Sequence, residues 1–159
     1  MAKKIQMVTC RYSHCKHDSK ELNKDDAVLV GKSTYYHKDC YREMQDMKDV
    51  VDLYCNYVDK HPNYSLLQKT IKRLVYEYKC PSGYLVYAVR YAIEKGWLKH
   101  ELGITYIVKD DKIKNAYKKY INSKVQKQYY KVTDEQNKGT EFVYKPQPKK
   151  SLSDLLQHN

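Results

Sequence analysis

Residues 33–44, STYYHKDCYREM, place His37 and Cys40 three positions apart at the start of an expected helix. Side chains at positions i and i+3 lie on the same face of a helix, so both can reach a single ion. Upstream, the segment TCRYSHC carries Cys10 and Cys15 with four residues between them. Two pairs of soft or borderline ligands suit the tetrahedral coordination of zinc. The spacing therefore predicts a Zn²⁺ site with the ligands Cys10, Cys15, His37 and Cys40.

The residues between the two ligand pairs predict a β-hairpin. AVLV and STYYH are short extended segments, and they flank the turn residues Gly31 and Lys32. A loop with one ligand pair, a hairpin, and a helix whose first turn carries the second pair form the layout of a treble-clef finger. Few large apolar residues precede Tyr41, so metal ligation is expected to supply folding free energy that a small core lacks. A closed site with four protein ligands leaves no position for water, which indicates a structural metal.

Other ligand sets are compatible with this part of the sequence. His14 and His17 lie beside Cys15, and either could replace it or lie behind it. We expect Cys15 to be the ligand, because thiolates dominate structural zinc sites. The alternative to a metal site is that the three cysteines are small buried residues and that the histidine caps a helix. Cys55 and Cys80 have no ligand partner at a useful spacing, and we expect both to be buried thiols.

The chain after the metal site predicts a small helical bundle, because apolar residues recur at intervals of three and four. The first helix continues to about residue 60, and the second begins at a capping Asn63. Ser82 is a candidate cap for the third helix, which stops at Gly96. GITYIVKD is expected to be extended, and a fourth helix begins at Asp110 or Asp111 and runs to about residue 128. The residues expected to face inward are Met47, Val50, Val51, Tyr54, Tyr57, Val58, Leu67, Ile71, Leu74, Val75, Tyr78, Leu85, Val89, Ala92, Ile93, Ile113, Ala116, Tyr117, Tyr120, Ile121 and Val125.

The expected fold class is mainly α, with an N-terminal treble-clef finger followed by a small helical bundle. Three parts are expected: residues 1–60 as the finger with its extended helix, residues 61–128 as a basic helical domain, and residues 129–159 as a flexible part. This last part contains a candidate hairpin around NKG, a Pro-Lys linker and a C-terminal tail. The tail, SLSDLLQHN, reads as a loose terminus or as a short helix that docks on a partner, and we expect the loose terminus.

Positive charge is concentrated in the second half of the chain. The formal net charge is +11, and residues 111–150 carry 11 Lys and Arg against 4 Asp and Glu, whereas residues 1–60 carry 11 against 10. A one-sided positive field favours phosphate backbones or acidic protein faces. The alternative is an ordinary solvated lysine surface. The candidate nucleic-acid-binding residues on helix exteriors are Lys69, Lys72, Arg73, Arg90, Lys112, Lys114, Lys118, Lys119 and Lys124, and the candidates for base stacking are Tyr129, Tyr130 and Tyr144.

Several other classes of function are not favoured. In a helix-turn-helix interpretation the recognition helix would begin GYLVYAVRY, which offers only Arg90 and tyrosines to base edges. The chain contains no nucleotide-cradling glycine loop, no paired catalytic carboxylates and no nucleophile elbow, so no enzyme and no catalytic residue are predicted. No apolar run is long enough for a membrane helix or a signal peptide, which predicts a cytoplasmic protein with no membrane partner.

Two segments resemble a group of small, mostly uncharacterised zinc-finger proteins encoded by bacteriophages of Gram-positive bacteria. They are STYYHKDCY after a Cys-x4-Cys pair, and SGYLVYAVRYAIEKG followed by GITYIVKDDKIKNAYKKY. The resemblance covers about residues 8–122 and implies a treble-clef site with zinc at the four ligands named above. It also implies a segment at residues 103–108 that the group shares, and a phage protein at work in the cytoplasm of a bacterial host cell.

These observations predict a zinc-stabilised protein that contacts the phosphate backbone of DNA or RNA through a lysine-rich helical face. The alternative is a protein-binding module of phage origin, such as an inhibitor of a host nucleic-acid-processing enzyme or a defence nuclease, comparable to an anti-CRISPR protein. The 18 tyrosines suit that alternative, because tyrosine is enriched at interface hot spots.

Overall fold

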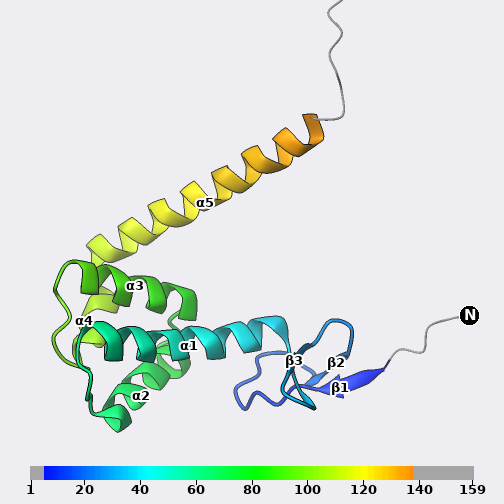
Figure 1. Ribbon diagram of the computed structural model, residues 1–159, viewed down its shortest axis with the longest axis horizontal. Coiled ribbons are helices and arrows are strands. Elements are labelled where there is room, and N and C mark those ends of the chain that lie inside the picture. The colour runs from blue at the N-terminus through cyan, green and yellow to red at the C-terminus, as the bar shows by residue number, and fades with distance from the viewer. Residues whose placement is uncertain (1–5, 138–159) are drawn as a thin grey trace, which may run out of the picture. The chain divides into compact units, whose positions relative to one another are not determined.

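The computed structural model describes the backbone of residues 6–137 and the side chains of residues 6–126. The chain is mostly helical, with two short antiparallel hairpins near the N-terminus (Figure 1), which confirms the predicted fold class at this level. Two compact units are distinguished, Met1–Tyr120 and Ile121–Asn159. Among residues 6–137, no helix has the length and apolar character needed to cross a membrane.

The two hairpins are joined through their backbones. Strand β3 (Val28–Val30) pairs with β4 (Thr34–Tyr36), as predicted, and Gly31 makes the turn with a φ of +67°, which glycine adopts at little cost. Strands β1 (Met7–Thr9) and β2 (Glu21–Asn23) form a hairpin that was not predicted. A parallel bridge between Cys10 and Tyr35 connects the first hairpin to the second.

The helices begin and end largely where the sequence predicts. They are α1 (Lys38–Tyr57), α2 (Tyr64–Lys72), a π-helical turn η1 (Arg73–Glu77), α3 (Ser82–Glu94), α4 (Gly103–Lys109) and α5 (Asp111–Asn137). Asn63 caps α2 as predicted: its Oδ1 accepts a hydrogen bond from the Leu66 N–H at 3.0 Å. The η1 turn continues α2 directly, and Lys79 closes it with a φ of +54°.

Two local predictions are wrong. The segment GITYIVK forms α4 rather than an extended piece, because Ile104 and Ile107 lie one helical turn apart and are both buried in the core. Ser82 does not cap α3; Pro81 occupies the cap position, and the Ser82 hydroxyl donates to Asp46 Oδ2 on α1 at 2.6 Å. That bond ties the start of α3 to α1.

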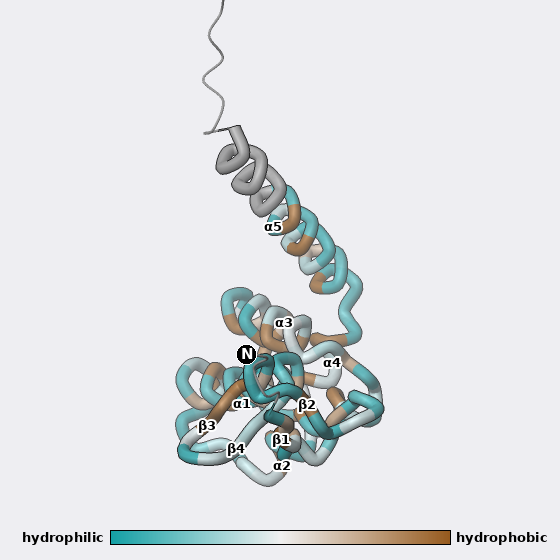
Figure 2. Tube along the Cα trace, turned by 90° about the vertical axis from the view of Figure 1, so that its right-hand side faces the viewer, coloured by the Kyte–Doolittle hydropathy of each residue, from teal (hydrophilic) through white to brown (hydrophobic). Residues whose placement is uncertain are grey.

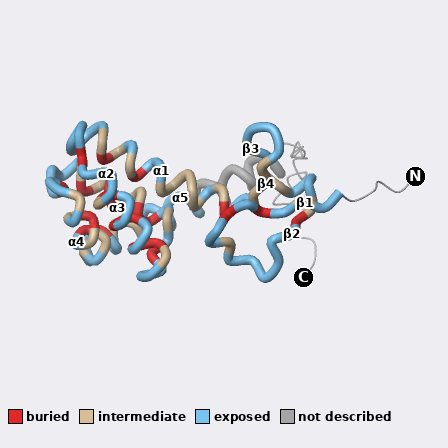
Figure 3. Tube along the Cα trace, turned by 90° about the horizontal axis from the view of Figure 1, so that it is seen from below, coloured by how far each residue is buried: buried red, intermediate tan, exposed pale blue. Residues whose placement is uncertain are grey.

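The principal core lies where α1, α2, η1, α3 and α4 meet (Figure 3). Hydrophobic positions alternate with hydrophilic ones along these helices, and others lie on β3 and α5 (Figure 2). Most residues that were predicted to face inward lie in this core or pack against it. The largest side chains that are almost fully buried include Tyr54, Leu67, Ile71, Leu74, Leu85, Ile104 and Ile113, and of these Ile104 was not predicted.

Some residues predicted to face inward are exposed. Tyr78 is 50% exposed because two cations hold its ring at the surface: the Arg73 guanidinium lies 5.3 Å from the ring centroid and the Lys109 ammonium 5.5 Å from it. Tyr57, in the last turn of α1, is 69% exposed. On α5, the residues Tyr120, Ile121 and Val125, which were predicted to face inward, are exposed.

The C-terminal predictions are only partly covered. Helix α5 continues past residue 128 to Asn137, so the fourth helix is longer than the apolar pattern predicts. The predicted Pro-Lys linker and tail, and most of the hairpin expected around residues 137–139, lie outside the described residues.

Replacing Asn63 with alanine is expected to lower the free energy of unfolding by about 1 kcal/mol, because the Leu66 N–H loses its acceptor. Chemical denaturation of the two proteins measures this difference. Asn63→Asp is the matched control, since a carboxylate also caps, and it should stay near the wild-type value. An Asn63→Ala protein as stable as the wild type would show that the cap contributes nothing.

Candidate metal centre

The four sequence-predicted ligands come from three different pieces of backbone. Cys10 follows β1, and its N–H donates to the Lys20 carbonyl at 2.7 Å. Cys15 lies in the next turn, where its N–H donates to the Tyr12 carbonyl at 3.3 Å. His37 is the cap residue of α1, and Cys40 lies in the first turn of that helix.

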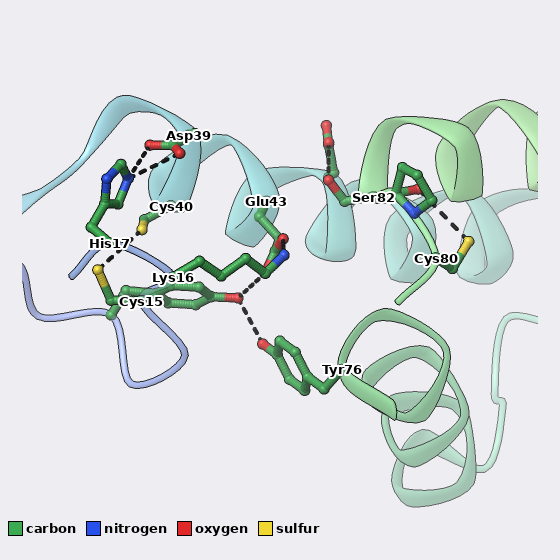
Figure 4. A network of polar contacts seen from close by, with 12 residues as sticks. Cys15, Lys16, His17, Asp39, Cys40, Glu43, Tyr76, Cys80 and Ser82 are labelled. Carbon is green, nitrogen blue, oxygen red and sulfur yellow. Dashed lines mark hydrogen bonds and ion pairs between the residues drawn. The ribbon is translucent and has the colours of Figure 1, made fainter. Parts of the chain in front are cut away.

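The ligand atoms of these four side chains all lie within 4.8 Å of one another. Cys15 Sγ lies 3.4 Å from His37 Nδ1 and 3.7 Å from Cys40 Sγ, and Cys40 Sγ lies 3.9 Å from His37 Nδ1. Figure 4 shows Cys15 and Cys40 facing each other across this cluster. All the cysteines are free thiols, and Cys10 and Cys40 are buried. The arrangement is compatible with a metal site.

The structure also gives the positions of His14 and His17, the two alternatives to Cys15 as a metal ligand. The His14 ring stacks on Tyr76, with centroids 3.7 Å apart and planes 16° apart. The His17 ring stacks on His37 at 3.8 Å, and its Nε2 lies 3.0 Å from both carboxylate oxygens of Asp39 (Figure 4). Together with Cys40, this exposed His17–Asp39 pair forms a second grouping of three potential ligands. Cys15, and neither His14 nor His17, therefore completes the set of four.

The thiols of the cluster ionise unequally. Burial raises the pKa of Cys10, but hydrogen bonds from the backbone N–H groups of His37 and Tyr12 and from the Cys15 and Cys40 side chains together outweigh this, and the net pKa is lowered. Burial and then the neighbouring Cys15 and Cys10 raise the pKa of Cys40 to about 12. Ionisation of Cys10 or Cys15 therefore makes ionisation of Cys40 less favourable. A bound cation would remove that repulsion.

A polar network fixes the loop between the first two cysteines to the helical unit (Figure 4). The Tyr12 hydroxyl donates to Glu43 Oε1 at 3.0 Å and lies 2.8 Å from the Tyr76 hydroxyl. Because Tyr12 has a single proton, Tyr76 is the donor in the second bond. Lys16, the residue after Cys15, pairs with the same Glu43 on α1. Burial, followed by the bonds to Tyr76 and Glu43, raises the pKa of Tyr12, so its phenol stays neutral.

Sequence reasoning missed the roles of Tyr76, Tyr12 and Glu43. Tyr76 lies on the η1 turn, where hydrogen bonds such as Tyr78 N–H to the Arg73 carbonyl span five residues. A π-turn rotates the side chains that follow it relative to an α-helix. The sequence carries no local signal for that rotation.

Every candidate nucleic-acid-binding residue whose side chain is described is exposed or partly exposed, but the structure separates these residues into groups. Lys69, Lys72 and Arg73 line one groove with a volume of about 710 Å³, together with His14 and Tyr76. We call this the basic groove. Its acidic residue, Glu77, pairs with Arg73 at 3.4 Å.

The remaining candidates lie elsewhere. Lys114 and Lys118 line a hollow of about 260 Å³ beside Tyr117, and Arg90 lies on α3 beside Tyr57. In Figures 1 and 2, α3 and α1 lie between α2 and the first turns of α5. The other α5 candidates are Lys112, Lys119 and Lys124. The stacking candidates Tyr129, Tyr130 and Tyr144 have side chains outside the described part of the chain.

No protein-family model, curated protein or solved structure matches this chain.

Each chain is expected to bind one divalent metal ion, and Cys40→Ala is expected to abolish tight binding because it removes a buried thiolate ligand. Cys55→Ala, further along α1, is the matched control, since that thiol contacts the Tyr64 hydroxyl at 3.6 Å instead. Elemental analysis of the purified proteins, and the visible absorption of their cobalt-loaded forms, would measure the difference. Equal metal content in the two variants would refute the ligand assignment.

Proposed function

We propose that the cluster binds Zn²⁺ and that the N-terminal module, residues 7–40, is a treble-clef finger. With Zn–S near 2.3 Å and Zn–N near 2.0 Å, tetrahedral zinc separates its ligand atoms by about 3.5–3.8 Å. The distances of 3.4, 3.7 and 3.9 Å in the cluster bracket that range. Three thiols and an imidazole are also a donor set that selects zinc over harder divalent cations. The order of loop, hairpin and helix start supports the treble-clef assignment.

The zinc has a structural role in this proposal. The hydrophobic cluster of the N-terminal module has only Cys10, Tyr12, Leu22 and Cys40 as its buried members among the described residues, and two of these are ligands. So small a core supplies little folding free energy, and metal ligation replaces the missing part. Four protein ligands occupy every position of a tetrahedral ion, which leaves none for a reactive water.

We further propose that the protein binds nucleic acid, and the observation that carries this proposal is the basic groove. Lys69, Lys72 and Arg73 present their charges along one hollow, and the paired Glu77 offsets only part of that charge. Such a row of cations attracts a phosphate backbone and releases its counterions. Contacts of this kind position a nucleic acid without reading its sequence.

The proposed zinc site supports one wall of this groove. His14 lies between the ligands Cys10 and Cys15, and its ring stacks on Tyr76 at the groove. The Tyr12–Tyr76 hydrogen bond lies beside that stack. Metal bound by the two cysteines would therefore hold the loop, and with it His14, against η1.

A second candidate function is a protein-binding module, in the phage context that the sequence resemblance implies. The observation that favours it is a set of large side chains that are about half exposed or more, namely Tyr57, Tyr64, Tyr78, Trp97 and Tyr106. Tyrosine and tryptophan are the residues most enriched at interface hot spots. Binding of this kind would weaken little with added salt, whereas phosphate binding weakens steeply.

Neutralising the basic groove by Lys69→Gln, Lys72→Gln and Arg73→Gln is expected to weaken nucleic-acid binding and flatten its salt dependence. The slope of log K against log salt should fall by roughly 0.7–0.9 for each phosphate that the groove no longer neutralises. Titrations at several salt concentrations measure both quantities. The matched control neutralises three exposed lysines outside the groove, Lys32, Lys60 and Lys99. Equal losses of affinity in the two triple variants would mean that net charge, and not the groove, determines binding.

Removing the metal with a chelator is expected to lower nucleic-acid affinity, because the Cys10–Cys15 loop then no longer holds His14 against Tyr76. Far-UV circular dichroism should show that the helices of the main core persist, and added zinc should restore affinity. Unchanged affinity in protein shown to be metal-free would separate the groove from the metal site.

A further inference from the structure

A continuous set of aromatic rings crosses from α3 to the first turns of α5. Tyr84 and Tyr117 have ring centroids 5.0 Å apart, Tyr117 and Tyr87 are 5.2 Å apart, and Tyr87 and Tyr120 are 5.1 Å apart. These separations are those of favourable aromatic pairs. The rings come from positions three residues apart on each helix, so one face of α3 and one face of α5 contribute them.

The same set extends along α3 to the residues that follow it. Tyr87 and Tyr91 lie 6.1 Å apart with planes 30° apart, and Tyr91 meets Trp97 edge-on at 5.9 Å. We call the whole set the aromatic strip: Tyr84, Tyr87, Tyr91, Trp97, Tyr117 and Tyr120.

The strip has a buried base and exposed ends. Tyr84 is buried, and its hydroxyl donates to the Val108 carbonyl at 2.9 Å. Tyr120 and Trp97 are 39% and 46% exposed. Rings held by their neighbours lose little conformational freedom when a flat ligand stacks on them. The exposed ends therefore form a preorganised stacking surface.

Lysines surround the strip. The Lys95 ammonium lies 5.8 Å from the Tyr91 ring centroid. Lys114 and Lys118 line the hollow beside Tyr117, and Lys114 also pairs with Asp111 at 3.0 Å. Residues 111–120 of α5 carry Lys112, Lys114, Lys118 and Lys119 against the single acidic residue Asp111.

This charge indicates what kind of molecule would cover the strip. A second copy of the chain would bring the same lysines face to face, which like-charge repulsion disfavours. A polyanion is complementary, and one with flat rings would also use the aromatic surface. Glu94 is an acidic neighbour of Tyr87, and with Asp111 it is outnumbered by the lysines around it.

We propose that the aromatic strip binds single-stranded nucleic acid, with bases stacked on Tyr120 and Trp97 and phosphates beside the flanking lysines. A duplex keeps its bases stacked on one another, so it cannot place them on these rings, whereas an unpaired strand can. The proposal rests on the nucleic-acid binding proposed above, and it adds the preferred substrate, a single strand.

The test uses the zinc-loaded full chain with a single-stranded oligonucleotide and a hairpin duplex of equal length. Tyr120→Ala and Trp97→Ala are each expected to weaken single-strand binding roughly five- to a hundred-fold, the effect of losing one stacked base, and to leave duplex binding unchanged. Tyr106→Ala removes an exposed tyrosine on α4 that lies outside the strip, and it should change neither affinity. Tyr120→Phe keeps the ring and should retain single-strand affinity.

Trp97 provides a direct readout, because it is the one tryptophan in the chain. Stacking of a base should quench the Trp97 fluorescence when the single strand is added, and addition of the duplex should leave the fluorescence unchanged.

Equal affinity for the two oligonucleotides, with both alanine variants unimpaired, would overturn the strip proposal and leave binding at the basic groove standing. Quenching by polyglutamate without quenching by the oligonucleotide would overturn it in favour of an acidic protein partner. Absence of binding to either oligonucleotide would instead refute the proposed function itself.

Discussion

The convergence of Cys10, Cys15, His37 and Cys40 is the constraint on which the N-terminal half of the structure depends. A loop, a hairpin and the start of a helix are each too small to hold a fixed position by packing alone. Their side chains meet at one point and share a core with few other members. In our account a zinc ion at that point supplies the folding free energy that the small hydrophobic core of the module lacks. The ion also attaches the hairpin region to the start of α1.

The constraint extends into the helical unit through the loop between the first two cysteines. Tyr12 and His14 both contact Tyr76, which the π-turn η1 directs toward the N-terminal module. The same turn lets the Arg73 side chain donate to the Tyr78 hydroxyl at 2.9 Å, beside the basic groove. A rare element of secondary structure thus lies where the candidate metal site and the candidate phosphate site meet. In other proteins, too, π-turns are frequent at functional sites.

The parts of this structure that could be predicted from sequence are those that local patterns specify. The spacing of the four ligands, the turn at Gly31 and the Asn63 cap depend on neighbouring residues, and the structure has each of these features in the predicted place. The extended conformation predicted for GITYIVK was wrong. Its β-branched residues favour a strand by propensity, but burial of Ile104 and Ile107 on one side of the segment favours a helix. The register change at η1 and the ring contacts between α3 and α5 arise from packing between distant segments, which no single segment encodes.

The two proposed binding surfaces use different physics on different helices. The basic groove offers the charges of Lys69, Lys72 and Arg73 beside the His14–Tyr76 stack, and the aromatic strip offers rings flanked by charge. In our account the groove also depends on the metal, because His14 lies between two of the proposed ligands. The most direct test of the central claim is X-ray absorption spectroscopy at the zinc edge of the purified full chain. Our account predicts three sulfur ligands at about 2.3 Å and one nitrogen at about 2.0–2.1 Å. A shell with two sulfurs and two nitrogens, or one made mainly of oxygens, would contradict it.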